Sequence, residues 1–212
     1  MPDALSRPQR HLIGAVMSSI QDDGFVIAGG AALVLAGVSV RPTEDLDAFS
    51  SACEDVGAVA ERLTDDLVDR GYVVEIHRSN ESFARLTVTT GRWRRTLMRV
   101  ELGADAQLLE SVSSPLGPML SLRELAANKV LAAFGRHETR DLVDLAALAQ
   151  VVPLPQAFAD AQRKDGGFRV EVLREMVART AGVRDDLWPA GSDPDAVREF
   201  VQNQLFTTAD PP

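Results

Sequence analysis

The chain has 212 residues, which suffices for one large domain or two small ones with a hydrophobic core. Its formal net charge of −9 argues against a domain that holds DNA by bulk positive charge, although a local basic strip can still contact nucleic acid. Cys53 is the single cysteine, which excludes an internal disulfide and argues against a zinc cluster. The sequence shows no clean signal-peptide core and no apolar run near the roughly 20 residues of a membrane span, so it predicts a cytoplasmic protein.

The N-terminal half is predicted to mix helices and strands. Apolar residues at helical spacing, or an acidic first turn closed by glycine, predict helices over 8–22, 31–37 and 54–71. Short apolar or alternating stretches predict strands at 25–28, 45–50, 72–78, 82–90 and 96–104. The strands at 72–78 and 82–90 are expected to form a hairpin around Asn80.

The second half changes to helix after Pro115 and Pro118. Ser121 followed by Glu124 fits a capping box at the start of a helix. Helical patterns predict helices over 120–134, 140–150, 155–164, 169–181 and 195–206. The expected plan is therefore an α+β protein, with a mixed sheet flanked by helices in residues 1–115 and a helical bundle in residues 116–212.

Gly29 and Gly30 lie between the strand at 25–28 and the short helix that follows. Glycine there permits a tight turn and lets a ligand approach the backbone without meeting a Cβ. The N–H groups that begin the next helix suit the phosphates of a nucleotide. Two glycines in a turn are more often only a turn, so this pattern alone decides nothing.

Three acids on predicted strands form a candidate metal site. Asp45 and Asp47 are two residues apart on one strand, so their side chains face the same side. Two such carboxylates repel each other unless a cation lies between them, and Mg²⁺ prefers hard oxygen ligands. Glu101 points away from Val100 and Leu102 on a later strand, where it either joins the aspartates or pairs with Arg99 at the surface. An acidic, solvent-exposed strand edge is the alternative for all three.

These motifs, taken in order, resemble the nucleotidyltransferases of the DNA-polymerase-β-like superfamily and, more narrowly, the AbiEii/AbiGii toxin family. In that family a "GGxAL" turn precedes "R-x-T-x-DLD", and here the matching segments are "GGAAL" (29–33) and "RPTEDLD" (41–47). The family also carries a helical lysine followed by an Arg-Asp pair and another aspartate. The matching residues are Lys129, Arg140, Asp141 and Asp144, so the resemblance covers roughly residues 25–148.

The resemblance implies roles for these residues. Asp45, Asp47 and Glu101 are expected to bind two Mg²⁺ ions, with Glu101 also the candidate general base. Lys129 is expected to neutralise oxygens of the NTP triphosphate as a point charge, the alternative being a solvated helix lysine. The triphosphate is expected to rest on the backbone of Gly29 and Gly30. Arg41 pairs with a phosphate or with Asp45. One of Asp141 and Asp144 contacts the nucleotide or positions Lys129, and the other only pairs with Arg140 or Arg136. The spacing does not say which aspartate has which role.

The resemblance further implies an enzyme that transfers a nucleotide from an NTP to the acceptor end of tRNA, as the toxin of a toxin–antitoxin pair with a cognate antitoxin. The basic strip "GRWRRTLMR", with Arg92, Arg94, Arg95 and Arg99, is the expected RNA-facing surface. Trp93 within it stacks on a base or packs on the sheet. Two alternatives stay open: the same chemistry on a cationic antibiotic of the aminoglycoside or lincosamide kind, and an inactive domain that binds nucleotide or protein.

Overall fold

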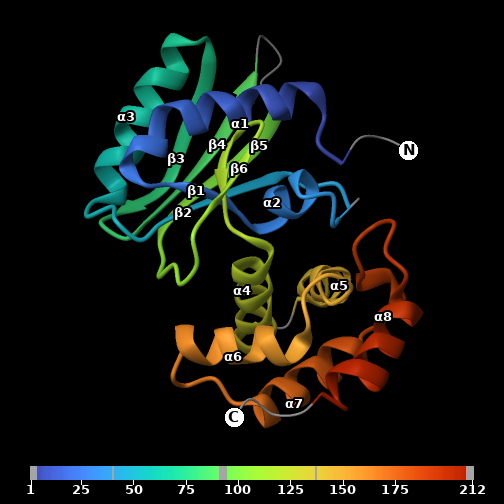
Figure 1. Ribbon diagram of the computed structural model, residues 1–212. Coiled ribbons are helices and arrows are strands. Elements are labelled where there is room, and N and C mark those ends of the chain that lie inside the picture. The colour runs from blue at the N-terminus through green and yellow to red at the C-terminus, as the bar shows by residue number, and fades with distance from the viewer. Residues whose placement is uncertain (1–3, 40, 91–94, 137, 209–212) are drawn as a thin grey trace. The chain divides into compact units, whose positions relative to one another are not determined.

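The fold is that of a computed structural model, which describes residues 4–39, 41–90, 95–136 and 138–208 (Figure 1). The chain divides into two compact units, Met1–Leu120 and Ser121–Pro212. Arg92, Trp93 and Arg94 of the basic strip lie outside the described residues. Within the described part of the chain, no helix is both long and apolar enough to cross a lipid bilayer.

The first unit is built on a mixed sheet, which confirms the predicted α+β class. Seven strands are described, in the order β3-β4-β5-β2-β1-β7-β6. They are β1 (Val26–Ala28), β2 (Asp45–Ser50), β3 (Tyr72–Asn80), β4 (Phe83–Thr90), β5 (Arg95–Ala104), β6 (Val112–Ser114) and β7 (Gly117–Met119). The pairs β2–β5 and β1–β7 are parallel, and the other neighbouring strands are antiparallel.

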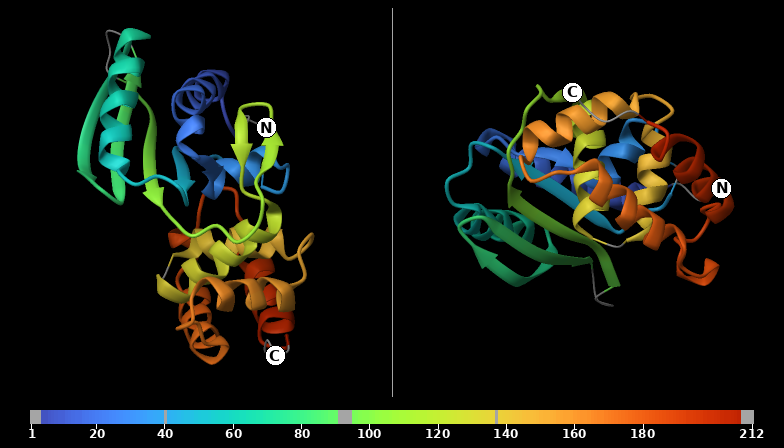
Figure 2. Two further views of the ribbon diagram at one scale, coloured as in Figure 1. Left: turned by 60° about the vertical axis from the view of Figure 1, so that its left-hand side comes forward. Right: turned by 90° about the horizontal axis from the view of Figure 1, so that it is seen from below.

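Two long helices cover one face of this sheet. They are α1 (Arg7–Ile20) and α3 (Val56–Asp69), which contact each other (Figure 2). Helix α3 packs on β3, β4 and β5, and α1 packs on β5 and β7. The strand side chains beneath them alternate with the polar ones of the opposite face, as the period of two requires. Leu86 of β4, Val100 of β5 and Leu46 of β2 are all fully buried on the helix-covered face. The opposite face therefore receives the polar residues of the same strands.

The short hairpin β6–β7 was not expected from the sequence. Strand β7 pairs in parallel with β1, and the Leu120 N–H donates to the Ile27 carbonyl at 2.9 Å. Each strand has only three residues, too few for alternation to be recognised, and Pro115 and Pro118 resemble a linker. The domain boundary expected at residue 115 falls inside this hairpin, and the first unit ends at Leu120.

The second unit is helical, as predicted. Its described α-helices are α4 (Leu122–Gly135), α5 (Thr139–Leu148), α6 (Leu154–Lys164), α7 (Val170–Ala181) and α8 (Pro194–Phe200), the last continuing into a π-helical turn over Val201–Leu205. Helix α4 packs against α5, α6 and α7 (Figure 1). Because three helices surround it, α4 buries charged residues as well as apolar ones, and each needs a partner.

Helix α4 begins at the predicted cap residue Ser121, but the Glu124 side chain bonds a residue of another helix. Ser121 accepts a hydrogen bond from the Glu124 N–H at 3.3 Å, which is the first half of the predicted capping box. The Glu124 carboxylate, which is 1% exposed, accepts from the Lys164 ammonium of α6 at 2.7 Å. Tertiary packing thus uses Glu124 to join α4 to α6.

Candidate active site

Strand β2 presents Asp45 and Asp47 on the sheet face opposite α1 and α3. The strand alternates between half-buried and buried residues, with Leu46 and Ala48 fully buried on the other side. This alternation places both carboxylates on one face, as the sequence predicts. Thr43 fixes the start of the strand, since its hydroxyl donates to the Asp45 carbonyl at 3.1 Å and its own carbonyl accepts from Gln9 of α1 at 3.0 Å.

The two glycines begin helix α2 (Gly29–Leu35) rather than preceding it. Gly29 has φ +57°, a left-handed conformation that strongly favours glycine. A Cβ on Gly29 would lie 1.8 Å from the Asp47 Oδ2 atom, so the carboxylate rests directly against the glycine Cα. The cause is the antiparallel pairing of β1 with β2, in which Ala28 is opposite Asp47.

Gly30 lies against the segment that carries Arg41 and Thr43. A Cβ on Gly30 would be 3.2 Å from the Thr43 Oγ1 atom and 3.5 Å from an Arg41 guanidinium nitrogen. The Arg41 guanidinium is therefore close to the first turn of α2. The motifs "GGAAL" and "RPTEDLD" meet in space at this point.

Glu101 lies beside the aspartates, as one of the two sequence hypotheses required. The parallel pairing of β2 with β5 puts Asp47 opposite Glu101 and Asp45 opposite Arg99. Val100 and Leu102 are fully buried, so Glu101 faces the same side as the aspartates. Three candidate metal ligands thus share one face across two adjacent strands.

Arginines from the same face engage two of these carboxylates. Arg99 Nε is 2.6 Å from Asp45 Oδ1, and Arg85 Nε of β4 is 2.8 Å from Glu101 Oε1. The hydrogen bond and charge of Asp45 raise the pKa of Arg99 above its already high value. Glu101 is hydrogen-bonded to Arg85, a residue that the sequence analysis did not single out. Arg99, the expected partner of Glu101 in the other hypothesis, pairs with Asp45 instead. Alternation along 83–90 was the available signal, since it puts Arg85 on the polar face.

The donor chemistry of this face fits a hard divalent cation. Asp45, Asp47 and Glu101 supply carboxylate oxygens, the ligands that Mg²⁺ prefers. Among the residues that the structure describes, no three acidic, histidine or cysteine side chains converge closely enough to hold one ion together. Arg99 and Arg85 engage one oxygen each of Asp45 and Glu101 instead.

In the helical unit, Lys129 joins α4 to α5 through both candidate aspartates. Its ammonium lies 3.0 Å from Asp141 Oδ1 and 2.8 Å from Asp144 Oδ2, and both aspartates are fully buried. Arg136 also donates to Asp141, at 2.7 Å. Burial by itself raises the pKa of Asp141, but the Arg136 hydrogen bond and the charges of Lys129 and Arg136 outweigh it, so the pKa is lowered. Both aspartates therefore position Lys129 in this structure.

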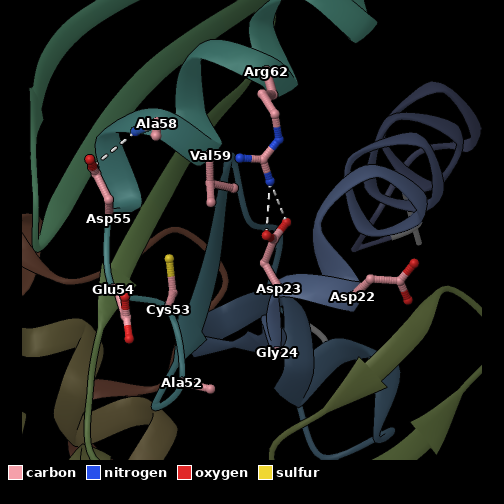
Figure 3. A pocket seen from close by; sticks show the side chains of 10 residues that line it. All are labelled: Asp22, Asp23, Gly24, Ala52, Cys53, Glu54, Asp55, Ala58, Val59 and Arg62. Carbon is pink, nitrogen blue, oxygen red and sulfur yellow. Dashed lines mark hydrogen bonds and ion pairs between the residues drawn. The ribbon is translucent and has the colours of Figure 1, made fainter.

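A pocket of about 410 Å³ lies at the far end of β1 and β2 from Asp47 (Figure 3). Its acids have structural tasks: Asp23 accepts two hydrogen bonds from Arg62 at 2.8 Å, and Asp55 accepts from the Ala58 N–H to begin α3. Burial raises the pKa of the Cys53 thiol, which lines the same pocket. These contacts account for the charged groups Asp23, Asp55 and Arg62 without a ligand.

Solved structures share this fold. The crystal structure of JHP933 from Helicobacter pylori matches with a TM-score of 0.61 and 20% sequence identity, over 93% of this chain and 92% of that one. MenT4, a nucleotidyltransferase toxin from Mycobacterium tuberculosis H37Rv, matches with a TM-score of 0.58 and 16% identity, over 94% and 83% of the two chains. The chain thus shares its fold with these two proteins.

The family follows from the sequence. The model of the family described as nucleotidyl transferase AbiEii toxin, type IV TA system, matches residues 12–211. The chain therefore belongs to the AbiEii nucleotidyltransferase toxin family, as the resemblance implied, and is a transferase enzyme. No curated protein sequence gives a significant match.

Proposed function

We propose that this protein transfers a nucleoside monophosphate from an NTP to the 3′ hydroxyl at the acceptor end of a tRNA, in a reaction that requires Mg²⁺ and releases pyrophosphate. The observation that carries the proposal is the seating of the Asp47 carboxylate against Gly29, with Asp45 on the same face and Glu101 opposite in register. The Asp47 carboxylate thereby lies beside the backbone that begins α2, and the other two acids share its sheet face. Membership of a nucleotidyltransferase toxin family supports the same chemistry.

The acidic residues have distinct roles in this proposal. Asp45, Asp47 and Glu101 hold the metal, and Mg²⁺ when bound lowers the pKa of the attacking hydroxyl and offsets charge on the leaving pyrophosphate. Glu101 accepts the proton of the hydroxyl. The hydroxyl oxygen forms its bond to the α-phosphorus while the bond from that phosphorus to the bridging oxygen of pyrophosphate breaks.

Two arginines control access to the carboxylates. Arg99 and Arg85 neutralise Asp45 and Glu101 while no metal is present, which relieves the repulsion among like charges on one sheet face. Side-chain exposures of 53% and 49% leave both arginines free to swing into solvent without unfolding the sheet. A metal ion held by Asp45, Asp47 and Glu101 would compete with both guanidinium groups for the carboxylate oxygens, and a released guanidinium would suit phosphate oxygens.

The remaining residues serve the triphosphate and the helical unit. Arg41, close to Gly30, is assigned to the triphosphate because a guanidinium binds phosphate oxygens in pairs. Lys129 was predicted to neutralise the triphosphate, and that role stays a prediction. In the structure its ammonium is held by Asp141 and Asp144, so its first task is to fix α5 against α4.

The metal assignment is tested with Asp47→Ala, using Asp22→Asn as a control at the other end of the sheet. Transfer of label from an α-³²P NTP to bulk tRNA is measured with and without Mg²⁺. We expect Asp47→Ala to lower the transfer rate by on the order of 10²–10³-fold, with an unchanged circular dichroism spectrum. The metal assignment would be refuted if Asp47→Ala kept full transfer activity and the wild type also transferred label in EDTA.

The acceptor is tested in the same assay. Label on tRNA, lost after treatment that removes the terminal nucleotide, supports the proposal. The net charge of −9 favours a cationic acceptor as the second candidate, so an aminoglycoside is tested in parallel. Label on the aminoglycoside and none on any RNA would replace the proposed acceptor. A cognate antitoxin is expected from the family and is sought as a protein that suppresses transfer.

A further inference from the structure

Beyond the acids, the polar face of the sheet carries two phenylalanines. Phe49 follows Asp45 and Asp47 on the same face of β2, and Phe83 lies on the same face of β4 as Arg85. Both rings are half-buried. Strand register places them on either side of Gly103, because Phe49 and Phe83 are each the partner of that glycine.

Gly103 leaves room on β5 for the ring of Phe49. A Cβ at that position would be 3.2 Å from Phe49 Cδ1 and 3.3 Å from Cε1, so the Phe49 ring occupies the space above the glycine. A larger residue on β5 would lift this ring away from the strand. The two aromatic side chains and Gly103 thus lie together on the sheet face that carries the carboxylates.

Two arginines flank Phe83 on the same face. The guanidinium carbons of Arg78 and Arg85 each lie 5.6 Å from the centre of the Phe83 ring, within the range of a cation–π interaction. Arg78 of β3 is the register partner of Arg85, and Arg85 is the partner of Glu101. A continuous row therefore leads from the carboxylates to two positive charges. We call Phe49, Phe83, Arg78 and Arg85 the sheet platform.

This combination suits one class of ligand. Aromatic rings bind nucleobases by stacking, at roughly 1–3 kcal/mol per base, and arginines bind the phosphates between them. Exposed bases are available in single strands, whereas a duplex hides them in the stack. An acidic protein repels polynucleotides in general, so a local set of arginines beside the acids gives the charge complementarity that such a ligand needs.

We propose that the sheet platform binds the single-stranded 3′ end of the RNA acceptor, with bases on Phe49 and Phe83 and phosphates on Arg78 and Arg85. The inference rests on the proposed function, because it assigns the acceptor surface of the same site. It transfers the RNA-facing role from the strip at Arg92–Arg99 to residues of β2, β3 and β4. The row of register partners then directs the terminal hydroxyl toward Asp47 and Glu101.

The test uses variants that spare the carboxylates. Phe83→Leu keeps an apolar side chain but removes the ring, and Arg78→Gln removes one charge. Arg70→Gln is the matched control, since Arg70 is an exposed arginine paired with Asp66 on α3. Binding of a fluorescein-labelled single-stranded RNA of about 12 nucleotides is measured by anisotropy with Mg²⁺ and without NTP, and transfer to the same RNA is measured with Mg²⁺ and NTP.

For each platform variant we expect the Kd and KM for RNA to rise by about 10-fold or more, with kcat within about twofold and the KM for NTP unchanged. In Arg78→Gln the slope of log Kd against log salt is expected to fall by about 0.7, the value of one phosphate contact on a single strand. Arg70→Gln is expected to match the wild type in every measurement.

The outcomes separate this inference from the proposed function. The inference would be overturned if both platform variants had the Kd, KM and salt slope of the wild type. Transfer to RNA in the same experiment would still support the proposed function. RNA binding that weakens in the variants, in a protein that labels only an aminoglycoside, would refute the function and with it the assignment of the platform to an RNA acceptor. No RNA binding by the wild type in the anisotropy assay would overturn the platform.

Discussion

Replacing Gly29 by alanine separates a positioning effect from a folding effect. Gly29 has φ +57°, and the new Cβ would lie 1.8 Å from Asp47 Oδ2 and 2.7 Å from Asp47 Cγ. Gly37 is the matched control, because it has φ +72° and nothing within 4 Å of an added Cβ. Both substitutions place alanine in the left-handed region, and only one of them touches the candidate metal ligand.

The two variants are expected to lose similar stability and different activity. Left-handed backbone costs a residue with a Cβ about 1–2 kcal/mol, so both free energies of unfolding fall by roughly that amount. In Gly29→Ala the Asp47 carboxylate must also retreat by more than about 1 Å, and such a displacement costs on the order of 10²-fold in rate. That factor corresponds to about 2.7 kcal/mol of activation free energy.

Urea unfolding followed by circular dichroism gives the stability of each variant, and transfer of label from an α-³²P NTP gives its activity. We expect Gly37→Ala to retain transfer within about twofold of the wild type, and Gly29→Ala to fall to about 1%. Equal activity of the two variants would show that the contact of Gly29 with Asp47 does not hold the carboxylate in place. The carboxylate position would then need another explanation.

Further predictions concern the buried charges and the thiol. Lys129→Met leaves buried carboxylates without their ammonium partner and should lower the free energy of unfolding by about 3–5 kcal/mol, whereas Arg184→Gln, at an exposed pair, should cost about 1 kcal/mol or less. The folded pKa of Asp141 lies below its ordinary 3.8, so its ion pairs stabilise the fold above that pH and cease to do so as pH falls through the folded pKa. Stability measured below pH 3.8 should thus fall less steeply in Asp141→Asn than in the wild type. Burial raises the pKa of Cys53 above 9.0, so iodoacetamide at pH 8.5 should alkylate it more slowly than free glutathione, as mass spectrometry can follow.

Each of these has a clear contrary result. A loss in Lys129→Met no larger than that in Arg184→Gln would mean that Lys129 contributes no more than a surface charge. Parallel stability curves below pH 3.8 for Asp141→Asn and the wild type would remove the linkage argument. If Cys53 were alkylated as fast as glutathione, and the modification disappeared in Cys53→Ser, the thiol would be as reactive as a free one and the expected protection by burial would be wrong.

Local patterning in the sequence determined much of the fold. The alternation around Asp45 and Asp47 placed both carboxylates on one face, and Glu101 was correctly turned away from Val100 and Leu102. Strand and helix periods are read within a few residues, so these faces are set by chemistry close along the chain. The three-residue strands β6 and β7 are too short to carry such a signal, and they were missed.

Only the tertiary structure decided what the polar groups touch. The contact of Gly29 with Asp47 follows from the antiparallel register of β1 and β2, and the pairing of Arg85 with Glu101 from that of β4 and β5. Strand register depends on contacts between segments distant in the chain, and a shift by one residue would turn each side chain to the other face. The sequence by itself therefore determined which residues face the site, and the assembled sheet decided which of them are neighbours.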